Sequence, residues 1–206
     1  MPFVTRFLVI ALIRVDFSLL NTLRTLLVRS MPPEWIPLAE LISSGSVSLK
    51  RGQVIPKKDK SDKNIYPVYS SSVINNGLMG YNDTYMFDDE LVSWSIDGGG
   101  DFFYREPHKF NITNVSGVIL VDKKVWNYRF IAEILSYQHA RLEFDYQSKA
   151  HPSVIQTLYS LPCISITQQC RFARAFELID KQIYLQGNLQ DSNYRLKQYL
   201  MQNLFI

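Results

Sequence analysis

The feature that most constrains this chain is a long amphipathic segment at its C-terminal end. No proline occurs from Thr167 to Phe205, and apolar residues recur at steps of three and four. Such spacing places apolar side chains on one face of an α-helix, and at 1.5 Å per residue this helix is nearly 60 Å long. A chain of 206 residues buries one substantial core. The segment 166–206 is therefore too long for its own globule and predicts a spacer helix that pairs with another helix.

The expected pairing positions share this apolar face. They are Phe172, Phe176, Ile179, Ile183, Leu189, Leu196, Leu200 and Leu204.

Residues 1–30 predict an N-terminal apolar segment with one helix, or two, over 3–29, because leucines 19, 20, 23, 26 and 27 recur at helical spacing. The apolar run Phe7–Ile13 is bracketed by arginines and falls well short of the roughly 20 residues of a membrane span. No small-x-small cleavage site follows it. Prolines 32 and 33 end the helix. A native helix and an extension from a mis-assigned start site both account for this segment.

Residues 31–165 have the composition of a sheet with long loops, rich in Gly, Asn, Ser, Tyr and β-branched residues. Turn-forming clusters such as Asn75-Asn76-Gly77 and Asp97-Gly98-Gly99-Gly100 separate short apolar runs. The expected strands are 65–69, 85–87, 91–96, 102–104 and 117–122. Helices are expected at 127–138 and 153–160, and a brief strand or extended connector at 163–166. We therefore expect an α+β fold with a curved, mostly antiparallel sheet followed by the long helix.

Charge is concentrated in one segment rather than spread over the chain. The net charge is only +3, but residues 50–63 hold six basic and two acidic side chains, a surplus of four. A local basic patch attracts a phosphate backbone, although a solvated loop is the alternative for a charge run considered alone. The two cysteines, Cys163 and Cys170, have no CxxC or Cys/His companions. This pattern fits a reducing cytoplasm and indicates neither a disulfide framework nor a zinc site.

Several phrases in a fixed order resemble a known family. Pro33-Glu-Trp35-Ile-Pro-Leu38 is followed by Gly52 and the basic segment, and then by Tyr66-Pro67-Val68-Tyr69-Ser70 and Asn76-Gly77. Later come the phrases at 91–98 and 114–120, Leu161-Pro162, Gln168-Gln169, and the helix phrases at 179–183 and 196–205. Over roughly residues 31–206 this order resembles the S (specificity) subunits of type I restriction-modification systems.

The resemblance implies a target recognition domain at 31–165 and a conserved spacer helix at 166–206. A full-length S subunit has two of each, whereas this chain has room for one and no internal repeat. The resemblance thus implies a half-length subunit that binds double-stranded DNA, docks methyltransferase subunits and, through them, a restriction subunit. Two copies would pair their helices antiparallel to recognise palindromic half-sites. Alternatively, the helix at 3–29 takes the place of the second conserved helix and makes dimerisation unnecessary.

The resemblance also indicates where DNA contacts are expected. Lysines would contact phosphates, and polar loop side chains would contact base edges in the major groove. The expected phosphate contacts are Lys57, Lys58, Lys60, Lys63 and Lys109. The expected base contacts are Ser70, Ser71, Ser72, Asn75, Asn76 and Arg105.

No catalytic, cofactor-binding or metal-binding residue is expected, so the chain is predicted to be non-catalytic. The Gly98–Gly100 run lacks the Lys-Ser/Thr that completes a phosphate-binding loop, and Met31-Pro-Pro-Glu34 lacks the parts of a methyltransferase motif. Two alternatives stay open. One is a nuclease that uses the carboxylates of 88–90 or of Glu143 and Asp145, and the other is a helical interaction scaffold without a DNA function.

Overall fold

The computed structural model of the protein describes residues 17–97, 99–142 and 149–204, and the chain divides into two units. One is the globular unit Met31–Ala173, and the other combines Met1–Ser30 with Arg174–Ile206. The expected helical residues 3–16, the turn residue Gly98 and the carboxylates of Glu143 and Asp145 lie outside the described residues.

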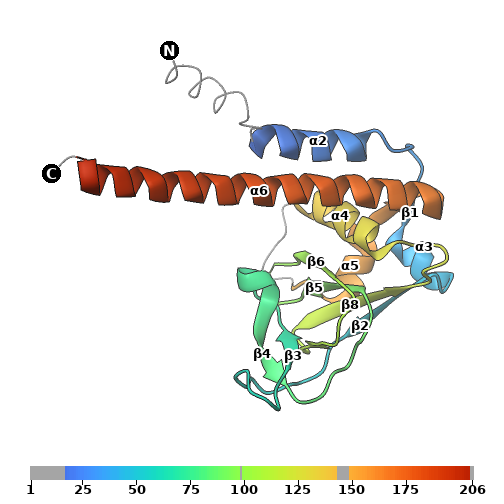
Figure 1. The fold of residues 1–206 in the computed structure, drawn as a ribbon. Coiled ribbons are helices and arrows are strands. Elements are labelled where there is room, and N and C mark those ends of the chain that lie inside the picture. Colours follow the sequence, from blue (N-terminus) through green and yellow to red (C-terminus); the bar gives the residue numbers. More distant parts are fainter. Residues whose placement is uncertain (1–16, 98, 143–148, 205–206) are drawn as a thin grey trace. The chain divides into compact units, whose positions relative to one another are not determined.

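The globular unit contains short elements around two main sheets (Figure 1). In chain order they are β1 (Trp35–Pro37), α3 (Leu38–Ser43), β2 (Val47–Arg51), β3 (Tyr66–Tyr69), η1 (Ile74–Gly77), β4 (Leu78–Asn82), β5 (Leu91–Ser95), β6 (Phe102–Arg105), β7 (Asn111–Ile112), β8 (Ser116–Val121), α4 (Tyr128–His139), α5 (Pro152–Leu158), β9 (Ser160–Pro162) and the first two turns of α6 (Ile166–Leu204).

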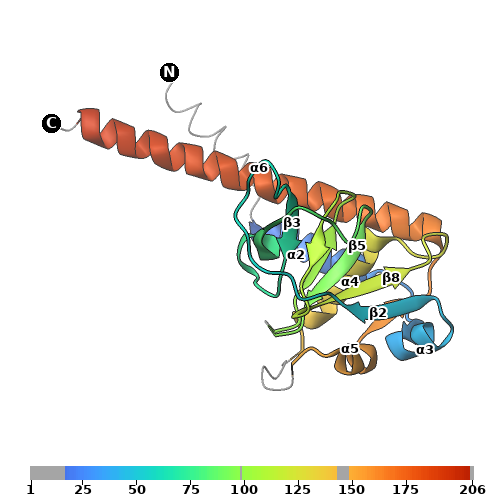
Figure 2. The ribbon, with the colours of Figure 1, turned by 90° about the horizontal axis from the view of Figure 1, so that it is seen from below.

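Antiparallel pairing dominates the globular unit. Four strands form an antiparallel sheet in the order β2-β8-β5-β6. A second sheet has the order β4-β3-β7, in which β3 is antiparallel to β4 and parallel to β7. β1 and β9 form a separate antiparallel pair. Helix α4 packs on β5 and β6 of the first sheet. Figure 2, seen from below, shows β2, β8 and β5 of this sheet. The α+β prediction with a mostly antiparallel sheet and a long C-terminal helix is confirmed.

Trp94 forms the centre of the core of the globular unit. Its side chain is fully buried and its indole N–H donates to the carbonyl oxygen of Ala150 over 2.7 Å. The directly paired residue on β8 is Gly117, where an added Cβ would lie 2.1 Å from the indole ring. Glycine is therefore required at 117, because the ring lies flat against the backbone of the neighbouring strand.

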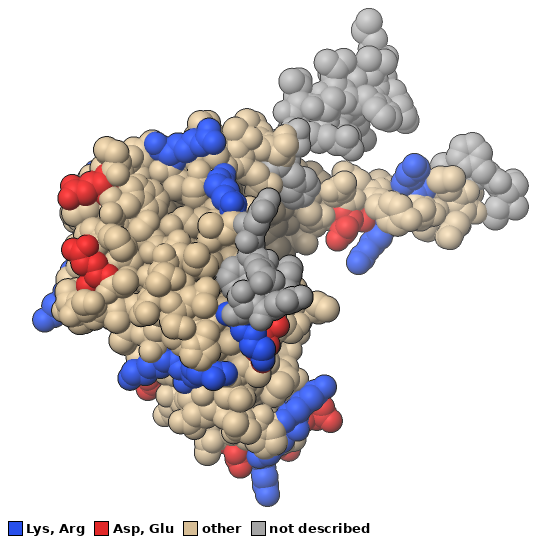
Figure 3. All heavy atoms as spheres, turned by 180° about the vertical axis from the view of Figure 1, so that it is seen from behind, with Lys and Arg blue, Asp and Glu red and all other residues tan. Residues whose placement is uncertain are grey.

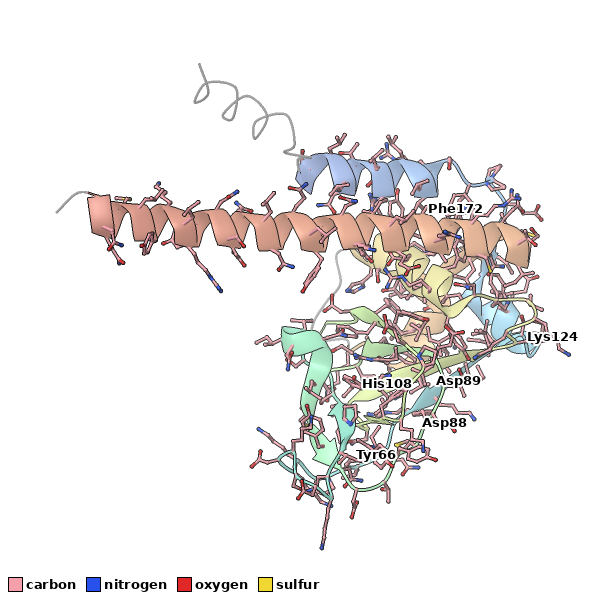
Figure 4. All side chains as sticks on the ribbon, viewed as in Figure 1. Tyr66, Asp88, Asp89, His108, Lys124 and Phe172 are labelled. Atoms are coloured by element: carbon pink, nitrogen blue, oxygen red, sulfur yellow. The ribbon has the colours of Figure 1, made fainter. Side chains whose placement is uncertain are left out.

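Three polar residues hold the start of the long helix within the globular unit. Ser165 and Gln168 form a capping box, in which the backbone N–H of Ser165 donates to Gln168 Oε1 over 3.1 Å and that of Gln168 donates to Ser165 Oγ over 3.4 Å. Buried Gln169 accepts from the N–H of Asn127 at the start of α4, and it donates to the carbonyl oxygens of Val125 and Ile164, each over 3.0 Å. Phe172 contacts Phe130 of α4 with ring centroids 6.2 Å apart (Figure 4).

In the other unit, helix α2 (Phe17–Arg29) runs antiparallel beside α6 (Figure 1). Arg24 and Asp180 form an ion pair between the two helices, and Leu20 and Val28 are buried. The observed α6 begins at the first residue of the predicted segment 166–206 and continues to Leu204, the last described residue. No helix within 17–97, 99–142 and 149–204 has the length and hydropathy of a membrane span.

Two local predictions need correction. Tyr85–Phe87 is not a strand, because only Phe87 forms an isolated bridge, to Phe110. The extended segment expected at 163–166 is instead β9 at Ser160–Pro162, because these residues pair with β1, and Ile166 already belongs to α6. Four of the five predicted strands match β3, β5, β6 and β8.

Candidate nucleic-acid interface

Most of the predicted DNA contacts lie around the β3–β4 hairpin, in two groups at its opposite ends. The first group lies in residues 52–65, which we call the basic loop. It joins β2 to β3 and leads to the open end of the hairpin at Tyr66. The second group lies in residues 70–77, which we call the hairpin loop, because they connect β3 to β4. The structure thus separates the expected phosphate contacts from the expected base contacts by the length of the hairpin.

The backbone of the basic loop is held against β4. The N–H of Tyr81 donates to the carbonyl oxygen of Lys58 over 2.9 Å, and a Cβ at Gly80 would lie 2.7 Å from the same oxygen. Glycine at 80 therefore permits the close approach of the loop. Lys57, Lys60 and Lys63 are exposed. Lys and Arg side chains project at the lower end of the molecule in Figure 3, interspersed with Asp and Glu.

Tyrosine rings hold two of the predicted lysines. The ammonium of Lys60 lies 5.5 Å from the ring centroid of Tyr81, and that of Lys109 lies 4.7 Å from that of Tyr85. Tyr85 in turn packs on Tyr66, with ring centroids 5.1 Å apart (Figure 4). A cation over an aromatic face gains about 0.5–1 kcal/mol at an exposed site. These amines are thus partly ordered before any ligand arrives.

The two lysine–tyrosine pairs lie on different faces of the hairpin. Tyr66 is directly opposite Asn82, and Tyr81 is opposite Pro67. Directly paired residues share a face and adjacent residues alternate, so Tyr66 and Tyr81 point to opposite sides. Lys60 and Lys109 are therefore not part of one flat patch, and a polyanion that contacts both must follow the open end of the hairpin. In the same region the ammonium of Lys58 lies 3.7 Å from the carboxylate of Asp83.

The hairpin loop has an unusual backbone. Asn75, Asn76 and Gly77 have φ angles of 51°, 53° and 80°, so three successive residues are left-handed. Asparagine tolerates this region better than most residues do, and glycine adopts it freely. The N–H of Ser70 donates to the carbonyl oxygen of Gly77 over 2.8 Å and closes the loop. A Cβ at Gly77 would lie 2.8 Å from Ser70 O, so the closure itself requires glycine at this position.

Arg105 of β6 anchors the hairpin loop from below. Its Nη1 donates to the carbonyl oxygen of Asn76 over 2.7 Å, and its Nε donates to Ser93 Oγ over 2.9 Å. The guanidinium lies 4.0 Å from the ring centroid of Tyr69 and 4.8 Å from that of Phe103. Burial lowers the pKa of Arg105 to about 10, so the side chain is still charged at neutral pH.

The burial of Arg105 differs from what a base-contacting residue requires. The residue is only 2% exposed, and its guanidinium faces Tyr69 and the loop backbone rather than solvent. Sequence reasoning expected it to contact DNA because a charged side chain is exposed by default. The structure instead places Arg105 underneath the loop that carries the other expected base contacts.

Further hydrogen bonds hold the hairpin loop and the neighbouring side chain of Tyr69. Ser95 Oγ donates to the carbonyl oxygen of Ser71 over 2.7 Å, and Thr113 Oγ1 donates to Ser70 Oγ over 3.1 Å. His108 Nδ1 lies 2.7 Å from the carbonyl oxygen of Glu106. Since a carbonyl can only accept, Nδ1 carries the proton, and Nε2 accepts from the hydroxyl of Tyr69 over 3.1 Å. Burial raises the pKa of Tyr69 and keeps its phenol neutral.

The outermost part of the hairpin loop is exposed. Val73 is 55% exposed and Ile74 78%, and Ser72, Asn75 and Asn76 are exposed as well. The hydroxyl of Ser72 accepts from the N–H of Ile74 over 3.1 Å. Among the predicted base contacts, Ser70 and Ser71 are half-buried and take part in the internal contacts just described. The exposed side chains at 72–76 are therefore the part of this loop that is available to a ligand.

The predicted helix-pairing positions differ in burial along α6. Phe176 and Ile179 are buried, and Phe172 and Ile183 are half-buried. Leu189, Leu196 and Leu200 are 49%, 55% and 40% exposed, while the side chain of Leu204 lies outside the described ones. The distal half of the helix thus presents several of its leucines to solvent.

Comparison with known proteins identifies the family of the globular unit. The model of the type I restriction modification DNA specificity domain matches residues 38–160, which is more than half of the chain. The chain belongs to this family.

Curated members of the family match with substantial identity. A putative type I specificity subunit of Mycoplasma pneumoniae is 40% identical over 90 residues, which are 43% of this chain and 24% of that protein. The N-terminal part of another putative type I specificity subunit from the same organism is 39% identical over 90 residues, 42% of this chain and 48% of that protein. The chain therefore spans less than half the length of these relatives.

Solved structures of the family share the fold of this specificity-domain chain. The S subunit of the type I restriction-modification system of M. genitalium matches with a TM-score of 0.61 and 16% identity, over 91% of this chain and 49% of that one. The HsdS subunit of Thermoanaerobacter tengcongensis matches with a TM-score of 0.62 and 12% identity, over 90% of this chain and 50% of that one. The resemblance to type I S subunits inferred from sequence is confirmed.

Sequence reasoning missed the residues that support this interface. Tyr81 and Tyr85 contact lysines, and Tyr66 packs on Tyr85. Ser95 of β5 holds the hairpin loop directly, and Ser93 of β5 holds it through Arg105. Tyrosines close in sequence to a basic segment were the available signal for the first group, whereas the two serines gave none. In the described part of the chain, no three His, Cys, Asp or Glu side chains gather in a way that could hold a metal ion.

Proposed function

We propose that this chain is the non-catalytic DNA-reading subunit of a type I restriction-modification complex, in which it recognises one half-site of a two-part target. The observation that carries this proposal is a specificity domain, matched at residues 38–160, that is followed by a 39-residue helix. The family of this domain supports the DNA ligand, and one such domain followed by one long helix is the unit that would recognise one half-site.

In this proposal the two ends of the hairpin have different tasks. Lysines of the basic loop, together with Lys109, contact phosphates and set the position of the protein on the duplex. The exposed residues of the hairpin loop contact base edges in the major groove, which admits a protruding element of this kind. Arg105 does not contact a base, because it is buried beneath the loop, and it acts as a positioning residue.

The long helix supports pairing with a second copy of this chain. Exposed Leu189, Leu196 and Leu200 are separated by seven and four residues, the spacing of a coiled-coil seam. Antiparallel pairing of two such helices relates two domains by a twofold axis, so the two half-sites would be inverted copies of each other. The paired helices also offer a surface on which methyltransferase subunits dock.

Helix α2 bears on this pairing, because it already lies beside α6 within the same unit. Its apolar residues Leu19, Leu23 and Leu26 are exposed on the outer side. Pairing through α2 alone would leave the chain monomeric, whereas pairing through the distal leucines of α6 gives a dimer. Light scattering on the full chain distinguishes these two arrangements.

The experiment combines oligomeric state with DNA binding. The full chain, alone and with co-expressed methyltransferase subunits, is analysed by light scattering and by gel shift on random duplexes. We expect a dimer that binds DNA, and Leu196→Glu should convert it to a monomer. Leu178→Glu is the matched control, because Leu178 is 56% exposed and Leu196 55%. Leu178 is not one of the predicted pairing positions. A chain that binds no duplex under either condition would refute the DNA-reading function, and a monomeric wild type would refute the pairing.

A further inference from the structure

The tip of the hairpin loop, residues Val73–Asn76, combines two side-chain chemistries on a fixed backbone. Two exposed aliphatic side chains precede two exposed asparagines. We propose that this tip reads an A·T base pair in the major groove, with an asparagine on the adenine and Ile74 against the methyl group of the thymine. This inference rests on the proposed function and specifies what one part of the interface recognises.

Both chemistries favour the same base pair. The amide of asparagine matches adenine, because its oxygen accepts from the N6 amino group while its NH₂ donates to N7. An aliphatic side chain matches thymine, because the C5-methyl group is the apolar feature of the major groove. Guanine is contacted most often by Arg or Lys, and the segment 70–77 contains neither. A guanine-reading loop would differ in composition.

The order of the loop backbone makes the tip suitable for reading. Arg105 holds the carbonyl oxygen of Asn76, Ser95 holds that of Ser71, and the Ser70–Gly77 hydrogen bond closes the loop. A loop that is already ordered pays little conformational entropy when it binds. The side chains at the tip are thus held on an ordered backbone, as discrimination between base pairs requires.

The exposure of the aliphatic pair also requires an explanation. Single exposed apolar residues are common on protein surfaces. Val73 and Ile74, however, are adjacent, more than half exposed, and located on a loop that several hydrogen bonds hold in place. An apolar contact with the thymine methyl removes part of this surface from water. A polar phosphate backbone offers no such gain, so the base edge is the favoured ligand.

The test uses modified bases together with loop variants that keep the backbone conformation. The preferred duplex is first selected from a random library with the full chain and its methyltransferase subunits. Each thymine of that site is then replaced by uracil, which lacks only the methyl group, and each adenine by 7-deazaadenine, which lacks N7. Variants are Ile74→Ala, Asn75→Gly and Asn76→Gly. Glycine is chosen because it accepts the positive φ at both asparagines.

We expect one thymine at which uracil weakens binding by the wild type about fourfold, the value of one buried methyl group. Ile74→Ala should remove this difference. At the paired adenine, loss of N7 should weaken wild-type binding roughly five-fold or more, as expected for a bidentate contact, and one of the two glycine variants should show no such loss. Leu158→Ala, an exposed aliphatic residue on α5, is the control and should keep the sensitivity of the wild type.

Each result decides between the two levels of the proposal. If the wild type selects no sequence, the proposed DNA-reading function fails, and this inference fails with it. If it selects a sequence, but Ile74→Ala stays as sensitive to uracil as the wild type is, the tip does not read thymine and only this inference is overturned. A selected site without A·T pairs would overturn it in the same way.

Discussion

Replacing Arg105 with methionine separates the anchoring of the hairpin loop from the stability of the domain. Methionine retains much of the apolar length of the side chain but removes the guanidinium. The carbonyl oxygen of Asn76 and the hydroxyl of Ser93 then lose their donors, and the cation leaves the face of the Tyr69 ring. The substitution thus releases the loop at its last left-handed asparagine.

The expected cost to global stability is small because two effects oppose each other. Hydrogen bonds from a charged donor stabilise by about 1.5–3 kcal/mol each, so two of them contribute about 3–6 kcal/mol. Burial lowers the pKa of Arg105 from 12.5 to about 10, which corresponds to a cost of roughly 3 kcal/mol for holding the charge. The free energy of unfolding should therefore fall by between about 0 and 3 kcal/mol.

The substitution should also lower the free energy that opposes local opening of the hairpin loop. Loss of the bond to Asn76 alone lowers the free energy of loop opening by about 1.5–3 kcal/mol, so the amide hydrogen of Ser70 should exchange roughly 10- to 150-fold faster. Hydrogen exchange measured by NMR or mass spectrometry on residues 70–77 tests this. The control is Arg51→Met, which removes an exposed guanidinium bonded to the carbonyl oxygen of Asn114. Equal exchange in wild type and Arg105→Met would show that Arg105 does not hold the loop.

Three further predictions address the loop, the helix junction and the phosphate contacts. Gly77→Ala should lower the free energy of unfolding by about 2–3 kcal/mol, because the added Cβ meets backbone atoms. The control Gly45→Ala should cost only about 1 kcal/mol, since a Cβ there meets nothing within 4 Å. Equal shifts of the two denaturation midpoints would contradict the predicted clash at Gly77. Gln169→Leu should lower the free energy of unfolding by about 2–4 kcal/mol, because three backbone groups lose their hydrogen-bond partner. The control Gln168→Ala, at an exposed position, should cost about 1 kcal/mol in the same measurement. Equal losses would argue against the buried network around Gln169. Replacing the four lysines of the basic loop with glutamine should flatten the slope of log binding constant against log salt by about 3.6; an unchanged slope would place the phosphate contacts elsewhere.

The sequence predicted the elements with strong periodicity. α6 follows from an uninterrupted apolar face without proline, and β5 and β8 follow from their apolar runs between glycine-rich turns. β2 and β7 were missed for a physical reason. β2 is a partly exposed edge strand that ends in Lys50 and Arg51, and the two residues of β7 are extended because they lie parallel to β3, a partner some forty positions earlier.

The candidate site was predicted by residue type but not by geometry. The lysines of the basic loop and the Asn75-Asn76-Gly77 turn stand out in the sequence and lie in loops of the structure. The location of these two groups at opposite ends of one hairpin depends on the pairing of β3 with β4. The burial of Arg105 depends on Ser93 and Tyr69, which meet it only in the folded sheets. Contacts of this kind leave no local pattern in a sequence.

The anchoring of the hairpin loop has a consequence for how such a domain diverges. Apart from the Ser70 and Ser72 hydroxyls, the hydrogen-bonded atoms of the loop are main-chain atoms, among them Ser70 N and the carbonyl oxygens of Ser71, Asn76 and Gly77. The side chains of Val73 and Ile74 are not needed for closure, so mutations there face little selection for folding. If the loop reads bases as proposed, a descendant gene can therefore acquire a new DNA preference through a few substitutions, provided that Gly77 and Arg105 are inherited unchanged.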